Sequence, residues 1–384
     1  MKTLQIGMDW FPDKQGGGLD RYYYDLTRFL PTIGVEARGL VTGPENLSEQ
    51  TLGQIHAFAP RQSPILKRLW SVRQQSQRLL GADQFSLYVS HFVLYTFPIL
   101  DQLQQRPLIV HFHGPWSLES IIEGNKSWGF QLRKAMELAV FRRASCFIVL
   151  SEAFKDILHN SYQVPREKIQ VIPGGVERGR FETHLSSSEA RVKLGWPQGR
   201  FIIFTARRLS RRMGLDNLVQ AMSTICQTHP ELLLLIAGKG ELEAALQTQI
   251  QALGLTHHIQ LLGYVSDADL PLAYRAADLA VLPTTSLEGF GLVVLESLAA
   301  GTPILGTPIG GIPEILESFC PDLLFEGYEP EQLARGIQEV LSGSRHLPSA
   351  ETCQNHIRDY YDWPIIAQRV KSIYQDLLDQ DSLF

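Results

Sequence analysis

The chain has 384 residues, of which 44% are hydrophobic and 20% charged, and its formal net charge is -5. This length predicts two domains that each bury a core, and it excludes a single small module. The longest apolar runs, such as 232–237, are far shorter than the roughly 20 residues that a membrane-spanning helix needs. Four cysteines without a C-x-x-C pair argue against a disulfide framework or a structural zinc site. The first ten residues are typical of a strand and not of a signal peptide, so we expect a soluble, cytoplasmic protein.

Short apolar runs, rich in β-branched or aromatic residues, alternate with helical stretches along the chain. Runs of this kind are typical of strands buried in a parallel sheet. The first series of predicted strands covers 4–8, 37–41, 87–92, 108–112, 146–150 and 169–172. The second series covers 201–205, 232–237, 259–262, 279–282, 303–306 and 323–325. We therefore expect an α/β protein with two doubly wound domains, whose strands present their carboxyl ends to a central cleft.

The boundary between the two predicted domains falls in a polar segment, 182–200, in which Ser, Gly and Pro are clustered. Such clusters are typical of turns and linkers. The sequence therefore predicts an N-terminal domain over 1–182 and a C-terminal domain over 183–363, followed by a helix over 364–384.

Three consecutive glycines, Gly16, Gly17 and Gly18, follow the first predicted strand and precede apolar residues at helical spacing. Glycines let backbone N–H groups approach a ligand closely, and the start of a helix favours an anion or a polar sugar. The loop is therefore a candidate ligand contact, with a plain turn as the alternative.

His113 lies at or just beyond the end of the predicted strand 108–112, where ligands bind in sheets of this kind. A neutral imidazole at this place can hydrogen-bond a substrate hydroxyl or polarise a reacting centre. The alternative is a histidine that caps the loop. His111 lies within the strand, and we expect it to pack in the core. Trp116 and Trp128 can stack on a sugar or lipid acceptor, or they can belong to the core.

Four arginines follow the first strand of the second series, within six residues of one another. They are Arg207, Arg208, Arg211 and Arg212. The planar, permanently charged guanidinium suits a diphosphate, whose charge must be offset when it departs as a leaving group. We expect one or two of the four arginines to be exposed to solvent without contacting a ligand.

Two carboxylates, Glu288 and Glu296, lie eight residues apart, in a loop and in the apolar helix that follows it. With a helix start near Phe290, the helical rise places Glu296 about 8 to 9 Å further along the axis, which suits a long ligand. The N–H groups of 289–292 would meet its phosphates, Glu288 its sugar and Glu296 a ribose. The alternative, a buried Glu296 without a ligand, is costly unless the carboxylate finds hydrogen-bond partners.

Together these residues resemble the retaining glycosyltransferases of family 4, which have two Rossmann-like domains (the GT-B fold) and use nucleotide-activated sugars. The resemblance extends over nearly the whole chain. It rests on Gly17-Gly18, His113-Gly114, 171–181, Arg208-Leu209, the pair Glu288 and Glu296, 301–303 and 310–314.

The resemblance implies a role for each matching residue. Glu296 would bind the nucleotide ribose and Glu288 the hydroxyls of the donor sugar, while His113 would face the reacting sugar. Arg208 matches the diphosphate arginine of the family, and the backbone N–H groups that meet the diphosphate belong to Gly289, Phe290, Gly291 and Leu292.

The chain departs from the family at Met213, where the family has a lysine five residues after the arginine. A methionine cannot offset phosphate charge. We therefore expect Arg212 or Arg207 to supply it, and donor affinity or activity depends on that replacement.

The resemblance also implies a reaction: transfer of a hexose from a nucleoside diphosphate sugar to a hydroxyl, with retention of configuration and without a metal ion or another cofactor. UDP-glucose is the favoured donor because it is frequent in the family. The acceptor belongs to polysaccharide, glycolipid or small-glycoside synthesis, and we expect no nucleic-acid partner. The alternatives are a nucleotide-sugar epimerase of the same architecture and a degenerate subunit that only binds a sugar nucleotide.

The sequence also predicts what two of the helices contact. The segment 65–80 places Lys67, Arg68 and other basic residues among Leu66, Leu69 and Trp70. It is either an amphipathic helix on an anionic membrane or, as we favour, a solvated helix packed by its Leu and Trp. The helix over 364–384 is expected to pack back onto the first domain, as in the family.

Overall fold

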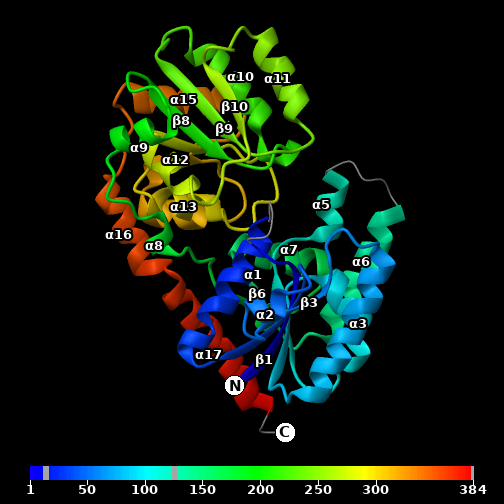
Figure 1. The fold of residues 1–384 in the computed structure, drawn as a ribbon. Helices are drawn as coiled ribbons and strands as arrows, with labels where there is room; N and C mark the ends of the chain where they lie inside the picture. Colours follow the sequence, from blue (N-terminus) through cyan, green and yellow to red (C-terminus); the bar gives the residue numbers. More distant parts are fainter. Residues whose placement is uncertain (12–16, 123–127, 382–384) are drawn as a thin grey trace. The chain divides into compact units, whose positions relative to one another are not determined.

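The computed structural model describes residues 1–11, 17–122 and 128–381, which form two compact units (Figure 1). Unit 1 comprises Met1–Gly175 and Trp363–Phe384, and unit 2 comprises Val176–Asp362. The boundary predicted at 182/183 is therefore wrong by seven residues. Its physical reason is a short parallel bridge, in which Val176 pairs with Asp362 and its N–H donates to the Tyr361 carbonyl at 2.9 Å. The segment after Gly175 thus already belongs to unit 2.

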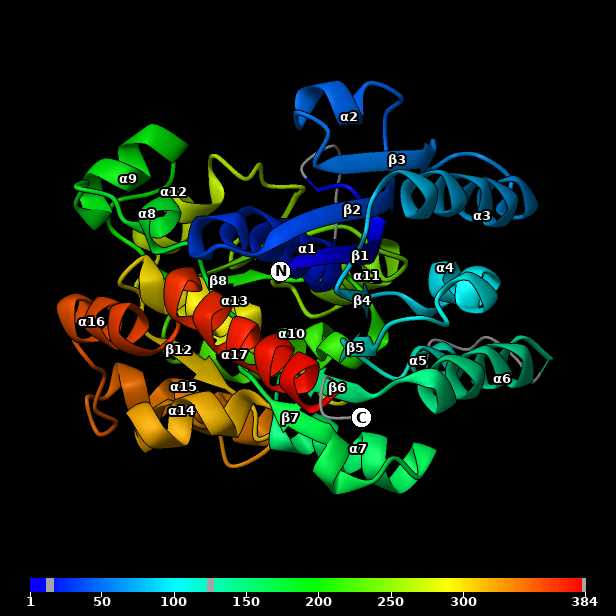
Figure 2. The same cartoon turned by 90° about the horizontal axis from the view of Figure 1, so that it is seen from below.

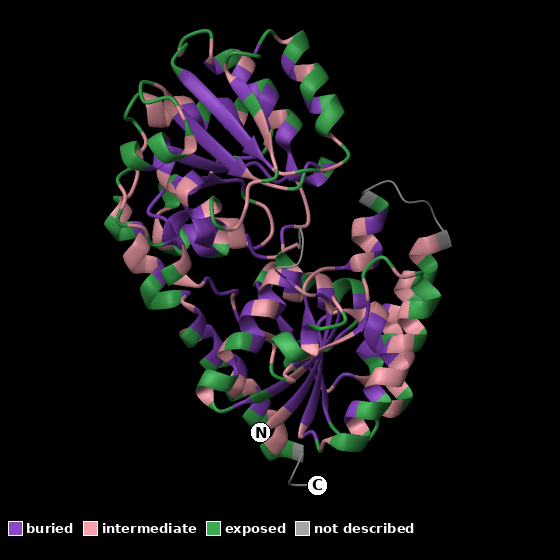
Figure 3. Cartoon of the chain, in the orientation of Figure 1, coloured by how far each residue is buried: buried purple, intermediate pink, exposed green. Residues whose placement is uncertain are grey.

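Unit 1 is built on a seven-stranded parallel sheet with the strand order β3-β2-β1-β4-β5-β6-β7. Every residue of β4, β5 and β6 is buried, which explains why these strands are apolar runs apart from Ser90 and His111 (Figure 3). The sequence missed β3, a short strand at the sheet edge whose His56 and Ala57 are only partly buried. The strands are β1 Lys2–Asp9, β2 Glu36–Thr42, β3 Ile55–Ala59, β4 Leu87–Ser90, β5 Leu108–Phe112, β6 Cys146–Val149 and β7 Ile169–Val171.

The helices of unit 1 include one that comes from the far end of the chain. This helix, α17, packs against α1 (Figures 1 and 2). Its Trp363 is fully buried, donates through Nε1 to Asp25 at 3.1 Å and stacks on Phe29. A Cβ on Gly175 would come within 2.9 Å of the same indole, so glycine is needed there. The helices are α1 Gly18–Phe29, α2 Leu47–Gln50, α3 Ile65–Ala82, α4 Val93–Thr96, α5 Trp116–Ile122, α6 Trp128–Arg143, α7 Glu152–Tyr162 and α17 Trp363–Asp381.

Unit 2 is built on a five-stranded parallel sheet with the order β10-β9-β8-β11-β12. The strand predicted at 323–325 is wrong, because Leu323 ends a 3-10 helix and Leu324 forms only an isolated bridge with Gly306. The strands are β8 Phe201–Ala206, β9 Leu232–Ala237, β10 Ile259–Gly263, β11 Leu279–Leu282 and β12 Ile304–Gly306. The helices are α8 Arg178–Phe181, α9 Ser187–Leu194, α10 Leu215–Ile225, α11 Glu243–Ala252, α12 Leu270–Ala276, α13 Leu292–Ala299, α14 Ile312–Phe319, α15 Pro330–Leu341 and α16 Ala350–Tyr360.

Across the described residues, no helix combines the length and the apolar character that crossing a membrane requires. The α/β class expected from the sequence is confirmed in both units: each has a parallel sheet whose strands alternate with helices.

Candidate functional site

The candidate donor site lies in unit 2, where two neighbouring strands end. β8 and β11 are paired, and their carboxyl ends lead into the loops 207–210 and 283–291. Parallel sheets of this kind bind ligands at that edge. The second loop leads into α13, whose N-cap is Gly291 with φ 92°. The helix therefore begins at Leu292 and not near Phe290 as the sequence predicted.

Glu288 is paired with an arginine. Its carboxylate accepts hydrogen bonds from Arg207 Nη2 at 2.5 Å and from Thr284 Oγ1 at 3.2 Å. The side chains of Arg207 and Glu288 are only 9% and 11% exposed. Removing one member of such a buried pair leaves the other charge uncompensated, so the pair holds both side chains in place.

The backbone of Glu288 is held as firmly as its side chain. Its carbonyl accepts from Gly311 N–H at 3.1 Å, and a Cβ on Gly310 would lie 1.8 Å from the same oxygen. Gly310 has φ 59°, a conformation that glycine adopts at least cost. The 310–314 motif found in the sequence thus positions the loop that carries Glu288.

The position of the missing lysine is occupied by a buried methionine. Met213 is 4% exposed, and its Sδ lies 2.7 Å from Arg207 Nη2. Arg207 Nε is buried and has no hydrogen-bond partner among the described residues. The guanidinium of Arg207 therefore lies beside the Met213 side chain and keeps one donor that a ligand oxygen could satisfy.

The other two arginines of interest differ from Arg207. Arg212 is buried and donates from Nη1 to the Leu287 carbonyl at 3.1 Å, so it supports the loop before Glu288. Arg208 is exposed. Of the two predicted replacements for the lysine, Arg207 contacts both Glu288 and Met213 through its Nη2.

Glu296 lies within α13 and is 8% exposed. Its Oε2 accepts a hydrogen bond from the hydroxyl of the fully buried Tyr274 at 3.4 Å. The carboxylate therefore has a protein partner, which lowers the cost of burying it without a ligand. Phe290, at the end of the preceding loop, buries its ring and keeps only 3% of its surface exposed.

In unit 1 the glycine loop is anchored by an acid that the sequence analysis missed. Asp20 is 1% exposed and accepts from the N–H groups of Asp9 at 3.2 Å and Gly17 at 3.1 Å. Burial, with the charge of Asp9 as a smaller cause, raises the pKa of Asp20 to about 7. The Gly17 N–H predicted to meet a ligand is thus bonded within the protein. Gly18 begins α1, and Gly16 lies outside the described residues.

His113 belongs to a cluster of three histidines at the ends of β4 and β5. His91 Nδ1 and His113 Nε2 are 3.2 Å apart, and His91 Nε2 lies 2.9 Å from Gln5 Oε1. His111 contacts the hydroxyls of Tyr22 at 3.3 Å and Tyr374 at 2.9 Å. Burial lowers the pKa of His113 to about 3 and the pKa values of His91 and His111 well below their usual value, so all three rings are uncharged at neutral pH.

The side chains of the same cluster could also hold a metal ion. One ring nitrogen of each of His91, His111 and His113 lies within 4.8 Å of the others. His91 was not singled out from the sequence, although it directly follows the strand that ends at Ser90. Its partners come from strands that are distant in sequence, so no local pattern marks it.

Trp116, the predicted acceptor contact, begins α5 and is partly buried. The guanidinium of Arg133 lies 5.2 Å above its ring, and Phe92 packs at 5.6 Å. One face of the indole is therefore in contact with the protein. The side chain of Trp128 lies outside the described residues.

The expectation that α3 is packed by its Leu and Trp is wrong for two of these residues. Leu66 is 77% and Trp70 61% exposed, whereas Leu69 packs on the core. Two of the helix's arginines are bonded within the protein: Arg68 donates to Tyr95 and Arg73 to Asp101.

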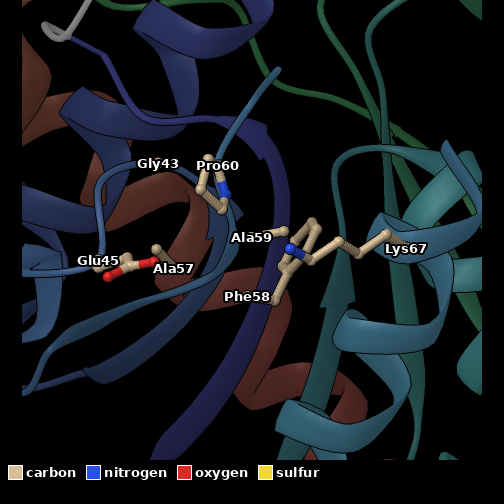
Figure 4. Close-up of a pocket in the computed structure, with 7 residues that line it drawn as sticks. All are labelled: Gly43, Glu45, Ala57, Phe58, Ala59, Pro60 and Lys67. Atoms are coloured by element: carbon tan, nitrogen blue, oxygen red, sulfur yellow. The ribbon is translucent and has the colours of Figure 1, made fainter. Parts of the chain in front are cut away.

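A small hollow of about 160 Å³ lies at the start of α3 (Figure 4). It is lined by Gly43, Glu45, Ala57, Phe58, Ala59, Pro60 and Lys67.

Two family models match this chain. The one described as Glycosyltransferase Family 4 matches residues 16–180, and the one described as Glycosyl transferases group 1 matches residues 186–359. Together the two matches extend over most of both units.

Relatives align over large parts of the chain. An uncharacterized glycosyltransferase of Methanocaldococcus jannaschii is 29% identical over 394 residues, which cover 98% of this chain and 98% of that protein. The mannosylfructose-phosphate synthase of Agrobacterium fabrum is 26% identical over 296 residues, which cover 71% of this chain and 65% of that protein.

Solved structures share the fold. Sucrose-phosphate synthase from Thermosynechococcus elongatus has a TM-score of 0.82 at 20% identity, with 99% of both chains covered. HepE from Anabaena, in complex with UDP-glucose, has a TM-score of 0.77 at 23% identity, with 98% of this chain and 100% of that chain covered. The family and the fold expected from the sequence are thus confirmed: the chain belongs to the family 4 glycosyltransferases and has their two-Rossmann-domain (GT-B) fold.

Proposed function

We propose that this glycosyltransferase moves a hexose from a nucleoside diphosphate sugar to a hydroxyl acceptor with retention of anomeric configuration. The buried pair of Arg207 and Glu288 carries the proposal, because it brings a sugar-binding carboxylate and a phosphate-binding guanidinium together at the edge of one sheet. UDP-glucose is the proposed donor, and the structural likeness to HepE, which was solved with UDP-glucose, supports it.

The donor is proposed to bind along α13. Glu296 holds the ribose hydroxyls, and the N–H groups of 289–292, in the loop that ends at the positive N-terminus of the helix, meet the diphosphate. Glu288 accepts hydrogen bonds from the sugar hydroxyls. Arg208, exposed on the loop after β8, reaches the diphosphate from the side of that strand.

Arg207 is proposed to supply the charge that the family takes from the lysine. Its side chain lies against Met213, and its unpartnered Nε offers a donor to a phosphate oxygen. A guanidinium keeps its charge in a buried place, where an ammonium is more readily deprotonated. Arg212 acts indirectly, by holding the Leu287 carbonyl and with it the loop.

The proposed reaction breaks the bond between the anomeric carbon and the phosphate oxygen through an oxocarbenium-like state. The acceptor oxygen bonds to the same face of the sugar, and its proton passes to the departing diphosphate. Arg207, Arg208 and the positive end of α13 offset the charge that develops on the leaving group, which is the largest contribution expected in such a site. The proposed reaction takes no metal ion and no further cofactor.

The acceptor is proposed to be a saccharide, a lipid-linked sugar or a small molecule with a free hydroxyl, bound beside His113 and Trp116. Peripheral contact of a cytoplasmic protein with an anionic membrane is proposed through α3, because Leu66 and Trp70 are exposed beside Lys67. Flotation with anionic vesicles would recover the wild-type protein, and the variant Leu66→Ser/Trp70→Ser would stay in the unbound fraction. Equal recovery of both proteins would remove the membrane contact.

The first experiment is a thermal-shift screen against UDP, GDP, ADP and their sugar conjugates in the presence of EDTA. A ligand that binds only the folded state raises the melting temperature by mass action. UDP-glucose is expected to stabilise the wild-type protein and the control Glu317→Gln, whose residue is exposed on α14, and to stabilise Glu296→Gln much less.

Product analysis by NMR completes the test. The expected result is an α-linked product and released UDP from α-linked UDP-glucose, in the presence of EDTA. A β-linked product would contradict retention, and loss of transfer in EDTA would contradict the metal-free reaction. An isomerised sugar nucleotide would favour the epimerase, and tight binding without turnover would favour the degenerate subunit.

A further inference from the structure

A chain of hydrogen bonds, buried except at its last member, runs from β1 to His113. Gln5 Nε2 donates to Thr3 Oγ1 at 2.8 Å, Gln5 Oε1 lies 2.9 Å from His91 Nε2, and His91 Nδ1 lies 3.2 Å from His113 Nε2. The strands β1, β4 and β5, which carry or precede these residues, are consecutive neighbours in the sheet. Thr3, Gln5 and His91 are 0 to 3% exposed, so water does not compete with these bonds.

The direction of each hydrogen bond follows from the first one. The Gln5 amide nitrogen donates to Thr3 Oγ1, whose own hydrogen is donated to the Glu36 carbonyl, so the Gln5 oxygen is the atom that faces His91. A carbonyl oxygen can only accept. His91 Nε2 must therefore carry the hydrogen, and because this buried ring is uncharged, its Nδ1 carries a lone pair.

The lone pair on His91 Nδ1 determines the state of His113. His113 Nε2 must donate to it, so Nε2 holds the single hydrogen of the uncharged ring. His113 Nδ1 then carries a lone pair, and it has no hydrogen-bond partner among the described residues. The ring is only partly buried, in contrast to His91 and His111.

We propose that Gln5 and His91 are positioning residues that hold His113 in the Nε2–H form, so that His113 Nδ1 accepts a hydrogen bond from a substrate hydroxyl. The assignment of that hydroxyl to a sugar rests on the proposed function. Without the relay, the ring of His113 exchanges between two forms, and only one of them accepts this bond.

A metal ion bound by the three histidines is the competing reading of the cluster. Five of their six ring nitrogens are already used in contacts with Gln5, Tyr22, Tyr374 and one another, within the part of the chain that the structure describes. A metal would need lone pairs that these contacts occupy. The hydrogen-bonded relay is therefore the arrangement that the distances favour.

The test reads the state of His113 directly. Long-range ¹H–¹⁵N spectra of the histidine-labelled protein distinguish a protonated ring nitrogen from an unprotonated one, and His113→Gln identifies its signals. We expect Nε2–H in the wild type and in the control His56→Asn, and a mixture of both forms in His91→Phe and Gln5→Met. Two independent variants guard against one that fails to fold. Nδ1–H in the wild type, or no change in the two variants, would overturn the relay.

Activity adds a second readout. Monodeoxy analogues of the donor and acceptor are compared with the parent compounds, and the wild type should turn over one of them about three- to tenfold less efficiently, as expected for one lost neutral hydrogen bond. In His91→Phe that difference in kcat/KM should become smaller, whereas a variant with a merely structural defect would lower kcat/KM for all substrates alike. A uniform decrease for all substrates would contradict the positioning role.

The outcomes separate this inference from the proposed function. If no sugar nucleotide is turned over while the spectra show Nε2–H, the relay stands and the proposed function fails. Addition of Zn²⁺ to the wild type should leave the ring signals and the melting temperature unchanged. Stabilisation by Zn²⁺ that is lost in His91→Phe would replace the relay with a metal site.

Discussion

The polar side chains of the candidate sites in the two units offset the free-energy cost of burial in different ways. Unit 2 buries a full ion pair, Arg207 and Glu288, in which each charge compensates the other. Unit 1 gathers three histidines that remain uncharged: His91 is hydrogen-bonded to His113, and His111 contacts two tyrosine hydroxyls. Charge compensation and hydrogen-bond direction are thus separate means of burying polar groups, which suit a charged diphosphate and a neutral hydroxyl respectively.

The largest effect is expected from breaking the ion pair. Arg207→Met leaves the Glu288 carboxylate buried without its partner, which costs about 3–5 kcal/mol of unfolding free energy in comparable pairs. The double variant Arg207→Met/Glu288→Gln should regain most of that loss, because no charge is left unpaired. Urea unfolding of the three proteins measures it, and equal stability of the single and double variants would show that the pair is not coupled.

The next largest effect is expected in the pH dependence of stability, to which the buried Asp20 of unit 1 contributes. Its pKa is about 7 in the folded state, against 3.8 for an unperturbed aspartic acid, so the folded protein binds the proton more tightly than the unfolded chain does. Stability from this group is therefore complete below about pH 4 and is lost as the pH rises to about 7, by up to about 4 kcal/mol.

Asp20→Asn should abolish that part of the slope between pH 4 and 7, as measured by chemical denaturation across the range. The buried histidines have lowered pKa values and give the opposite slope, with stability lost as the pH falls below about 6.5. An unchanged profile in Asp20→Asn would show that its carboxyl does not titrate in this range.

A charge-relocation experiment sharpens the role of Arg207. Arg207→Gly should lower kcat by about 100- to 1,000-fold, the range seen when one transition-state donor is removed. Adding Met213→Lys to that variant should restore much of the rate, because the two side chains lie in contact. Arg212→Gln with Met213→Lys is the matched control and should show no comparable gain. Failure of the lysine to rescue would mean that Arg207 acts through Glu288 alone.

The smallest effect is expected at Glu296. Tyr274→Phe removes a neutral hydroxyl that donates to the carboxylate at 3.4 Å, a long hydrogen bond worth about 0.5–1.5 kcal/mol. Calorimetric titration with UDP should show affinity that is reduced at most about tenfold, with little change in the melting temperature. A loss of unfolding free energy in Tyr274→Phe as large as that in Arg207→Met would contradict the distinction between a charged pair and a single hydroxyl.

Much of the fold could be predicted because its strands are buried on both faces. The runs 108–112 and 232–237 are apolar throughout, apart from His111, and both form strands. The edge strand Ile55–Ala59 was missed because partial burial permits polar residues. The domain boundary was misplaced because the bridge between Val176 and Asp362 joins residues that are distant in sequence, and no local pattern marks it.

The candidate site was predictable where one short segment carries it. Glu288, Glu296 and the glycines between them follow one strand and could be found together. The partners of these groups could not be found in this way, because Arg207 is 81 residues from Glu288 and His91 is 22 residues from His113. Only the pairing of strands in the sheets brings each partner to its place.

The return of α17 to unit 1 has a consequence for the order of folding on the ribosome. Unit 2 is a continuous segment, Val176–Asp362, inserted between the two parts of unit 1. All of unit 2 emerges before Trp363, the indole that fills the space beside Gly175 and binds Asp25. Because domains generally fold as units during synthesis, the segment made first would be the one completed last, and its nascent sheet would wait with an apolar gap for its final helix.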